Sequence, residues 1–384
     1  MVTRADRGLF AEWWWTVDRY LLLAVLVLMA GGIVLSFAAS PPVAERLNID
    51  SYHFVQRQAF FAVPAVLVLL GISLLSPAQV RLTAVGVFLF AFLLTVATLF
   101  FGAEVKGSTR WISFLGMSLQ PSEFLKPAFV ILVAALFAEG AKRPEVPGKP
   151  LAALLLAMVL APLVAQPDFG QAMLVAIVWG ALFFLAGLSW FLTVFLAGLG
   201  AAGLIGAYFL LPHVAGRINR FLNPDAHDNF QVETAIESFV SGGWLGRGPG
   251  EGTVKLILPD SHTDFVFAVT AEEFGIFACG LIVLAFAFVV LRGLRHAERE
   301  HDMFVRLATS GLLVLFGVQA CINMAVNLHL MPAKGMTLPF ISYGGSSLIA
   351  VALGMGFVLA LTRRRPRIDA VLPKRTVVMR ERAA

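Results

Sequence analysis

Apolar residues fill long stretches of this chain, and polar residues gather in the segments between them. The run 21–28 is continuously apolar, unlike the alternating segments of a membrane β-barrel. A helix needs about 20 apolar residues to cross the hydrocarbon core of a bilayer. Stretches close to that length occupy residues 20–39, 58–76, 81–102, 121–138, 151–165, 171–188, 190–211, 265–292, 305–328 and 343–361. The pattern predicts an all-α polytopic membrane protein with about ten transmembrane helices.

The composition excludes the other classes of protein. Hydrophobic residues make up 59% of the 384 residues and charged residues 14%, with a mean hydropathy of +0.83. An ordinary soluble domain has about 25% charged residues, and a disordered chain combines low hydrophobicity with high charge. Both cysteines lie inside apolar runs, which argues against a disulfide framework and against a thiolate metal site.

Basic residues predict the orientation of the helices. Lys and Arg are frequent in 139–150, in 292–306 and after 362, and cytoplasmic loops carry such an excess. Odd–even counting places these segments and the N-terminus on one side. We therefore expect a cytoplasmic segment 1–19, a membrane domain 20–362 and a basic cytoplasmic tail 363–384. The first span is too long to be a cleaved signal and is predicted to be retained.

The concentrated polar motifs fall on the opposite, extracytoplasmic side. That side receives the segments 40–57, 103–120, 166–170, 212–264 and 329–342. The longest of them, 212–264, is predicted to be one large extracytoplasmic loop. This distribution indicates that chemistry or recognition takes place outside the cytoplasm.

Two charged motifs precede or open the fourth span. Arg110 beside Trp111 could hold a phosphate or a lipid headgroup, or could be a snorkelling arginine next to an interfacial tryptophan. Glu123 and Lys126 are spaced as a salt bridge on one helix face. Such a pair at the edge of a span either faces a cavity or locks the helix end.

Carboxylates mark the eighth span. Asp264 stands where a helix N-cap is expected. Alternatively, desolvation beside Phe265 could raise its pKa and make it a general base. Glu272 and Glu273 lie deeper in the same apolar stretch, and intramembrane carboxylates are functional candidates by default.

Glycine and proline dominate two further segments. The run 241–250 could present backbone N–H groups to an anion or could be a flexible loop, but it lacks the Gly-Lys-Ser/Thr of a Walker A motif. The cluster 331–347 must have irregular backbone, which survives beside a membrane only where protein or a polar cavity covers it. Lys334 is the one cation in that cluster.

Taken together and in order, these motifs resemble the SEDS family (shape, elongation, division and sporulation), whose members have ten spans and polymerise peptidoglycan. The resemblance covers nearly all of residues 15–362. The segment 332–335, Pro-Ala-Lys-Gly, is most similar to the cell-division member of the family. The motifs that carry the resemblance are 107–111, 120–126, 166–171, 241–265 and 334–347.

The resemblance implies transfer of a lipid-linked disaccharide-peptide, lipid II, onto a growing glycan, with inversion and release of undecaprenyl pyrophosphate. It implies that Asp264 is the catalytic residue. The residues proposed to bind the substrate or its pyrophosphate are Arg110, Lys126, Lys334, Arg247, Glu123 and Ser342. A divalent cation, Mg²⁺ or Mn²⁺, could accompany the pyrophosphate, although the sequence shows no dedicated metal cage.

The resemblance also implies partners and a location. The partners are a class B penicillin-binding protein transpeptidase and other divisome proteins, with no nucleic acid, and the location is the bacterial inner membrane at the division septum. Three alternatives remain: a polymerase of cell elongation, a lipid II flippase and a non-catalytic divisome scaffold. A flippase would need polar groups on both faces, and a scaffold would tolerate Asp264→Asn.

Overall fold

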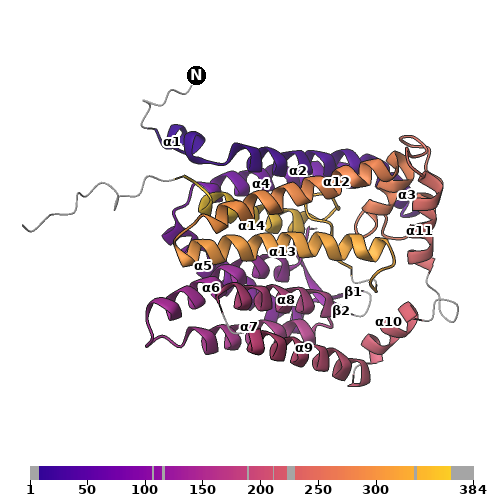
Figure 1. Cartoon of the computed structure of the whole chain (residues 1–384). Helices are drawn as coiled ribbons and strands as arrows, with labels where there is room; N and C mark the ends of the chain where they lie inside the picture. The colour runs from indigo at the N-terminus through magenta and orange to yellow at the C-terminus, as the bar shows by residue number, and fades with distance from the viewer. Residues whose placement is uncertain are drawn as a thin grey trace, which may run out of the picture.

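Long apolar helices run side by side through the protein (Figure 1). The structure is a computed structural model that describes residues 8–105, 108–114, 117–187, 190–210, 212–222, 230–332 and 335–364. Among these residues, eight helices are long and apolar enough to cross a membrane, and two shorter ones, α8 and α14, are apolar as well. These helices are α2 (Arg19–Ala39), α4 (His53–Ser73), α5 (Pro77–Phe101), α6 (Pro121–Lys142), α7 (Gly148–Ala165), α8 (Phe169–Leu185), α9 (Trp190–Leu210), α12 (Val266–Glu298), α13 (Met303–Asn327) and α14 (Gly345–Leu361). Each predicted stretch corresponds to one of them, which confirms the polytopic helical fold.

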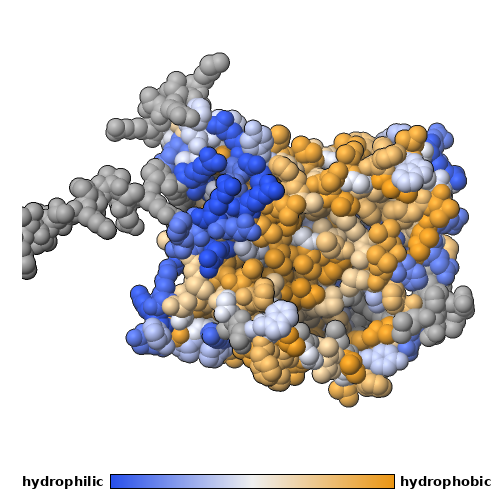
Figure 2. All heavy atoms as spheres, viewed as in Figure 1, coloured by the Kyte–Doolittle hydropathy of each residue, from blue (hydrophilic) through white to orange (hydrophobic). Residues whose placement is uncertain are grey.

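Different short helices lie at the two ends of the bundle, and both ends are hydrophilic (Figure 2). Short helix α1 (Leu9–Thr16) and the end of α14 lie at one end, and α3 (Pro41–Arg46), α10 (Pro212–Leu222) and α11 (Phe230–Gly242) lie at the other (Figure 1). Figure 2 shows a broad apolar band between hydrophilic surfaces at both ends. The end that carries α1 is called the basic end, and the end that carries α3 and α11 is called the sheet end. The band is the expected surface of a multi-span membrane protein.

Side-chain caps fix several helix boundaries at the basic end. Asp18 accepts hydrogen bonds from the backbone N–H groups of Tyr20 and Leu21 at the start of α2. Asp302 caps α13 in the same way, and Ser76 forms a capping box with Gln79 at the start of α5. Asp18 also binds Arg292 and His296 of α12. Despite its burial, these hydrogen bonds hold the pKa of Asp18 far below its usual range. The contacts of Asp18 with Arg292 and His296 join the start of α2 to α12.

The segment before α6 forms a small sheet, which the pattern of the sequence does not predict. Strands β1 (Ala103–Val105), β2 (Ser108–Phe114) and β3 (Met117–Leu119) pair antiparallel in the order β1-β2-β3. Strands of three to seven residues give only a weak alternating signal, which explains why they were not predicted. The sheet lies at the sheet end and carries Arg110 on its central strand.

The segment 212–264, which the sequence predicts to be one large extracytoplasmic loop, contains secondary structure that the sequence does not predict. The segment contains α10, α11 and a 3₁₀ turn, Val254–Leu256, and its glycine-rich run packs against a break in α12. The break is at Gly275, whose φ of 79° leaves the helical region. Arg247 and Gly248 donate N–H groups to the carbonyls of Glu272 and Glu273 at 2.9 and 3.0 Å. These N–H groups therefore bind helix carbonyls and do not form an anion cradle.

Candidate active site

A cavity of about 990 Å³ opens at the sheet end. Segments far apart in the sequence line it: α4, the sheet, the start of α6, α10 and α11, residues 259–265, α13 and residues 335–347. Its polar lining includes Arg57, Arg110, Glu123, Asp260, Asp264, Asn323 and His329. The cavity thus collects most of the motifs that the sequence analysis placed on one face.

Asp264 lies on the cavity wall immediately before α12. The N-cap of that helix is Phe265, which makes no side-chain cap hydrogen bond, so the expectation that Asp264 caps the helix is not met. Its backbone N–H donates to the Asp260 carbonyl at 3.1 Å. A Cβ added to Gly335 would lie 3.6 Å from Asp264 Oδ2, so the carboxylate borders the segment that follows Lys334. Lys334 itself lies outside the described residues.

Arg110 lines the cavity from β2 and is held from behind by the turn between α7 and α8. Its Nη2 donates to the Pro167 carbonyl at 3.1 Å, and its Nη1 lies 3.4 Å from Asp168 Oδ1. Asp168 also caps α8 through the N–H of Gln171. Burial raises the pKa of Asp168, and the Arg110 guanidinium acts in the opposite direction. Asp168 therefore orients Arg110 and starts a helix, without lining the cavity.

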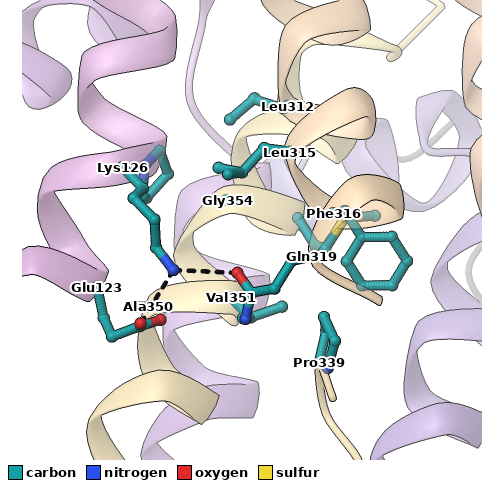
Figure 3. Close-up of a pocket in the computed structure, with 12 residues that line it drawn as sticks. Glu123, Lys126, Leu312, Leu315, Phe316, Gln319, Pro339, Ala350, Val351 and Gly354 are labelled. Atoms are coloured by element: carbon teal, nitrogen blue, oxygen red, sulfur yellow. Dashed lines mark hydrogen bonds and ion pairs between the residues drawn. The ribbon is translucent and has the colours of Figure 1, made fainter. Parts of the chain in front are cut away.

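Glu123 and Lys126 form a buried ion pair one helical turn deeper (Figure 3). Lys126 Nζ donates to Glu123 Oε1 at 2.9 Å and to Gln319 Oε1 of α13 at 3.0 Å. Glu123 also accepts from Gln171 of α8 at 2.6 Å and from Ser347 of α14 at 3.3 Å. Glu123 lines both the large cavity and a small, mostly apolar pocket of about 30 Å³, whereas Lys126 lines the small pocket and not the large cavity. The pair thus links four helices, and only Glu123 lines the large cavity.

Two other predicted substrate residues lie away from the cavity lining. Arg247 is exposed and donates to the Ser241 carbonyl and to Thr253 Oγ1. Ser342 is buried, and its Oγ accepts the N–H of Leu338 at 2.8 Å. The structure brings Arg110, Glu123 and Asp264 together at one cavity but does not bring these two residues to it.

Glu272 and Glu273 have structural partners. The Glu272 carboxylate accepts the backbone N–H groups of Thr253, Val254 and Lys255 at 2.6, 2.7 and 2.8 Å. Glu273 forms an ion pair with the Lys255 side chain. Neither glutamate lines the cavity. Through these contacts the two glutamates of α12 hold residues 253–255, which lie in the segment before Asp264.

Several polar residues that line the cavity were not predicted from the sequence as site residues. Arg57 faces it from the first turns of α4, beside Tyr343. Burial raises the pKa of Tyr343, and Arg57 acts to lower it. Asn323 of α13 also lines the cavity. The spacing of Gln319, Asn323 and Asn327 at every fourth position of an apolar helix was the signal that could have found Asn323.

The described part of the chain offers no group of three or more His, Cys, Asp and Glu residues arranged to hold a metal ion. The carboxylates that line the cavity are Glu123, Asp260 and Asp264, and Glu123 already binds Lys126, Gln171 and Ser347. A divalent cation at this site would therefore take most of its ligands from the substrate.

Comparisons with known proteins agree with this architecture. The chain is 48% identical over 366 residues to a protein of Caulobacter vibrioides named "Probable peptidoglycan glycosyltransferase FtsW", covering 94% of this chain and 93% of that protein. A protein of the same name from Trichlorobacter lovleyi is 35% identical over 356 residues, or 90% and 93% of the two chains.

Solved structures match over most of their length. A chain from a peptidoglycan synthase complex that coordinates polymerization and crosslinking has a TM-score of 0.74 and 29% identity, covering 90% of this chain and 97% of that one. The rod shape determining protein RodA of Thermus thermophilus has a TM-score of 0.68 and 27% identity, covering 91% and 97%. The sequence model of the FtsW/RodA/SpoVE family, described as cell cycle protein, matches residues 18–366. This chain therefore belongs to the FtsW/RodA/SpoVE family of cell cycle proteins, the SEDS family that its motifs resemble.

Proposed function

We propose that the protein is a peptidoglycan glycosyltransferase that polymerises lipid II into glycan strands. The observation that carries the proposal is the shared cavity of Asp264, Arg110 and Glu123, which come from three separate motifs. Its volume is at the upper end of the roughly 300–1,000 Å³ of ordinary ligand pockets, which suits a large substrate headgroup. The names of the relatives support the same activity.

In the proposed reaction, Asp264 acts as the general base. Its carboxylate takes the proton of the acceptor 4-hydroxyl while that oxygen attacks the anomeric carbon of the donor sugar. The bond from the anomeric carbon to the pyrophosphate oxygen breaks, and undecaprenyl pyrophosphate leaves with the bonding electrons. Attack opposite the leaving group inverts the anomeric centre.

Cations stabilise the negative charge that develops on the leaving pyrophosphate. Arg110 is the best placed of the proposed residues because it lines the cavity. Lys334 is the second candidate, supported by the closeness of Gly335 to Asp264. Lys126 would act through Glu123, to which it is bound. A Mg²⁺ or Mn²⁺ ion bound by the pyrophosphate would add further charge stabilisation.

We further propose that the sheet end faces the outside of the cytoplasmic membrane. Support comes from the Lys and Arg residues at the basic end, which would be cytoplasmic together with both termini. Similarity to the FtsW relatives favours work at the division septum. Similarity to a chain of a peptidoglycan synthase complex supports a penicillin-binding transpeptidase as partner, with lipid II as substrate and other divisome proteins as neighbours.

The second candidate is a polymerase of cell elongation, because the RodA structure is also similar. The location of a fluorescent fusion separates the two: midcell favours the division enzyme, and the lateral wall favours the elongation enzyme.

Incubation of the purified protein with lipid II, with and without its transpeptidase, tests the activity. Glycan ladders on a gel are expected from the wild type and not from Asp264→Asn. A folded wild-type complex that yields no ladder would overturn the polymerase proposal in favour of a scaffold or a flippase.

A further inference from the structure

One face of α13 carries three amide side chains in an otherwise apolar helix. Gln319, Asn323 and Asn327 follow one another at intervals of four residues, so they lie on the same face. All three are buried, with 3%, 2% and 0% of their surface exposed. We call this set the amide ladder. Buried amides among apolar side chains are costly unless they are hydrogen-bonded.

Every amide of the ladder holds a main-chain carbonyl outside the helices. Gln319 Nε2 donates to the Thr337 carbonyl at 3.2 Å. Asn323 Nδ2 donates to two carbonyls, Met336 at 2.6 Å and Asp264 at 3.0 Å. Asn327 Nδ2 donates to the same Asp264 carbonyl at 2.9 Å. The ladder therefore binds two different segments of irregular backbone.

The amide oxygens of Asn327 and Gln319 also accept hydrogen bonds. Asn327 Oδ1 accepts the N–H of Ala268 in the first turn of α12, and Gln319 Oε1 accepts from Lys126. The N–H and carbonyl groups of irregular backbone need such partners when they are buried. Asn323 is the member that joins the Asp264 segment and the 335–342 segment through one side chain.

We propose that the amide ladder is a positioning element, with Asn323 as the residue that sets the Asp264 carboxylate against the 335–342 segment. The proposal rests on the function proposed above for Asp264. The two segments meet where Gly335 lies beside Asp264 Oδ2, so a small shift of either changes the geometry of the base. Misplacement of a reacting group by about 1 Å can cost on the order of 100-fold in rate.

The test compares Asn323→Leu with Asn323→Gln in the purified full-length protein bound to its transpeptidase, with lipid II as substrate. Leu has no donor for the two carbonyls, whereas Gln keeps an NH₂ group. We expect Asn323→Leu to lower kcat by about 100-fold while KM changes by less than about threefold. Asn323→Gln should retain clearly more activity than Asn323→Leu. Equal kcat for the two variants, or wild-type kcat in Asn323→Leu, would overturn the positioning role.

Thr309→Val is the matched control. Thr309 is a buried polar residue of the same helix, its Oγ1 has no hydrogen-bond partner among the residues that the structure describes, and it lies outside the cavity lining. It should keep wild-type kcat, which shows that loss of a polar group from α13 is not enough. If Asn323→Leu does not give folded protein, Asn327→Leu takes its place, because it removes one hydrogen bond to the Asp264 carbonyl, together with the acceptor of the Ala268 N–H, and leaves the bond from Asn323 to Met336 intact. A kcat loss of about tenfold is then expected, and wild-type kcat would overturn the proposal.

Asp264→Asn, measured in the same assay, separates the two levels of the argument. If Asp264→Asn polymerises lipid II as well as the wild type does, the function proposed for Asp264 fails, whatever the Asn323 variants do. If Asp264→Asn is inactive and Asn323→Leu is fully active, the amide ladder alone is refuted.

Discussion

Two sets of carboxylates at the sheet end have opposite surroundings. Asp264 lines a large cavity, and its backbone carbonyl accepts hydrogen bonds from Asn323 and Asn327. Glu272, eight residues later in the chain, has no place on the cavity wall and accepts three backbone N–H groups with its side chain. Glu273 is occupied by Lys255. A carboxylate of a membrane protein can therefore accept buried backbone N–H groups, as that of Glu272 does, or belong to a residue on a cavity wall, as that of Asp264 does.

The largest effect is expected from Asp264→Asn. The amide matches the carboxylate in size but does not take the proton of the acceptor hydroxyl. We expect polymerisation of lipid II to fall by about 100- to 10,000-fold, while the thermal unfolding midpoint stays within a few degrees of the wild type. Asp260→Asn is the matched control, because Asp260 also lines the cavity and the substitution keeps the backbone carbonyl that accepts the Asp264 N–H. A similar loss in both variants would remove the distinction between Asp264 and its neighbour.

The opposite result is expected for Glu272→Ala. Its removal leaves three backbone N–H groups, two of them buried, without their acceptor, which should destabilise the fold by about 3 kcal/mol. The thermal unfolding midpoint in detergent should fall by several degrees, and activity should fall because the segment before Asp264 loosens. Glu251→Ala, an exposed glutamate in the same region, should leave the midpoint unchanged. If Glu272→Ala keeps its midpoint and loses activity, Glu272 takes part in the reaction as Asp264 does, and the structural role assigned to it is wrong.

The sequence predicts the parts of the fold that depend on local patterns, and it does not predict those that depend on contacts between residues far apart in the chain. Apolar length is a local property, so the sequence predicts the eight long helices and the two shorter apolar helices, α8 and α14, but not the short helices α3, α10 and α11. The sheet 103–119 was missed because its strands are short. The break at Gly275 was missed because its partners, Gly243 and Trp244, are about 30 residues away in the chain. Pairing over that distance leaves no periodic signal.

The candidate site was predicted in part for the same reason. Odd–even counting placed the motifs of Arg110, Glu123 and Asp264 on one side, and the structure brings these residues to one cavity. Counting did not show which way a side chain points, so Arg247 was included although it lies outside the cavity lining. Arg57 was omitted because it lies at the edge of an apolar stretch and not inside a motif.

A moderate effect on substrate binding is expected from Arg110→Gln. The neutral side chain removes a charge-assisted contact with the proposed pyrophosphate, so KM for lipid II should rise about tenfold. Arg110→Lys keeps the charge but loses the planar fork and should lie between Gln and wild type. Steady-state kinetics with lipid II measure both. An unchanged KM in Arg110→Gln would support the alternative of a snorkelling arginine that only packs beside Trp111.

The smallest effect is expected from Arg247→Gln, which tests whether the segment bound by Glu272 and Glu273 has a structural role alone. Arg247 belongs to the same glycine-rich segment that Glu272 and Glu273 bind, and its guanidinium donates only to Ser241 and Thr253 in that segment. Exposed substitutions of this kind change stability by no more than about 0.5 kcal/mol, so kcat, KM and the unfolding midpoint should all stay within about twofold or a few degrees of wild type. A tenfold rise in KM would mean that the segment closes over the cavity when lipid II binds, and would return Arg247 to the pyrophosphate site. Wild-type kinetics would mean that the glycine-rich segment has a structural role, as its hydrogen bonds to Glu272 and Glu273 of α12 indicate.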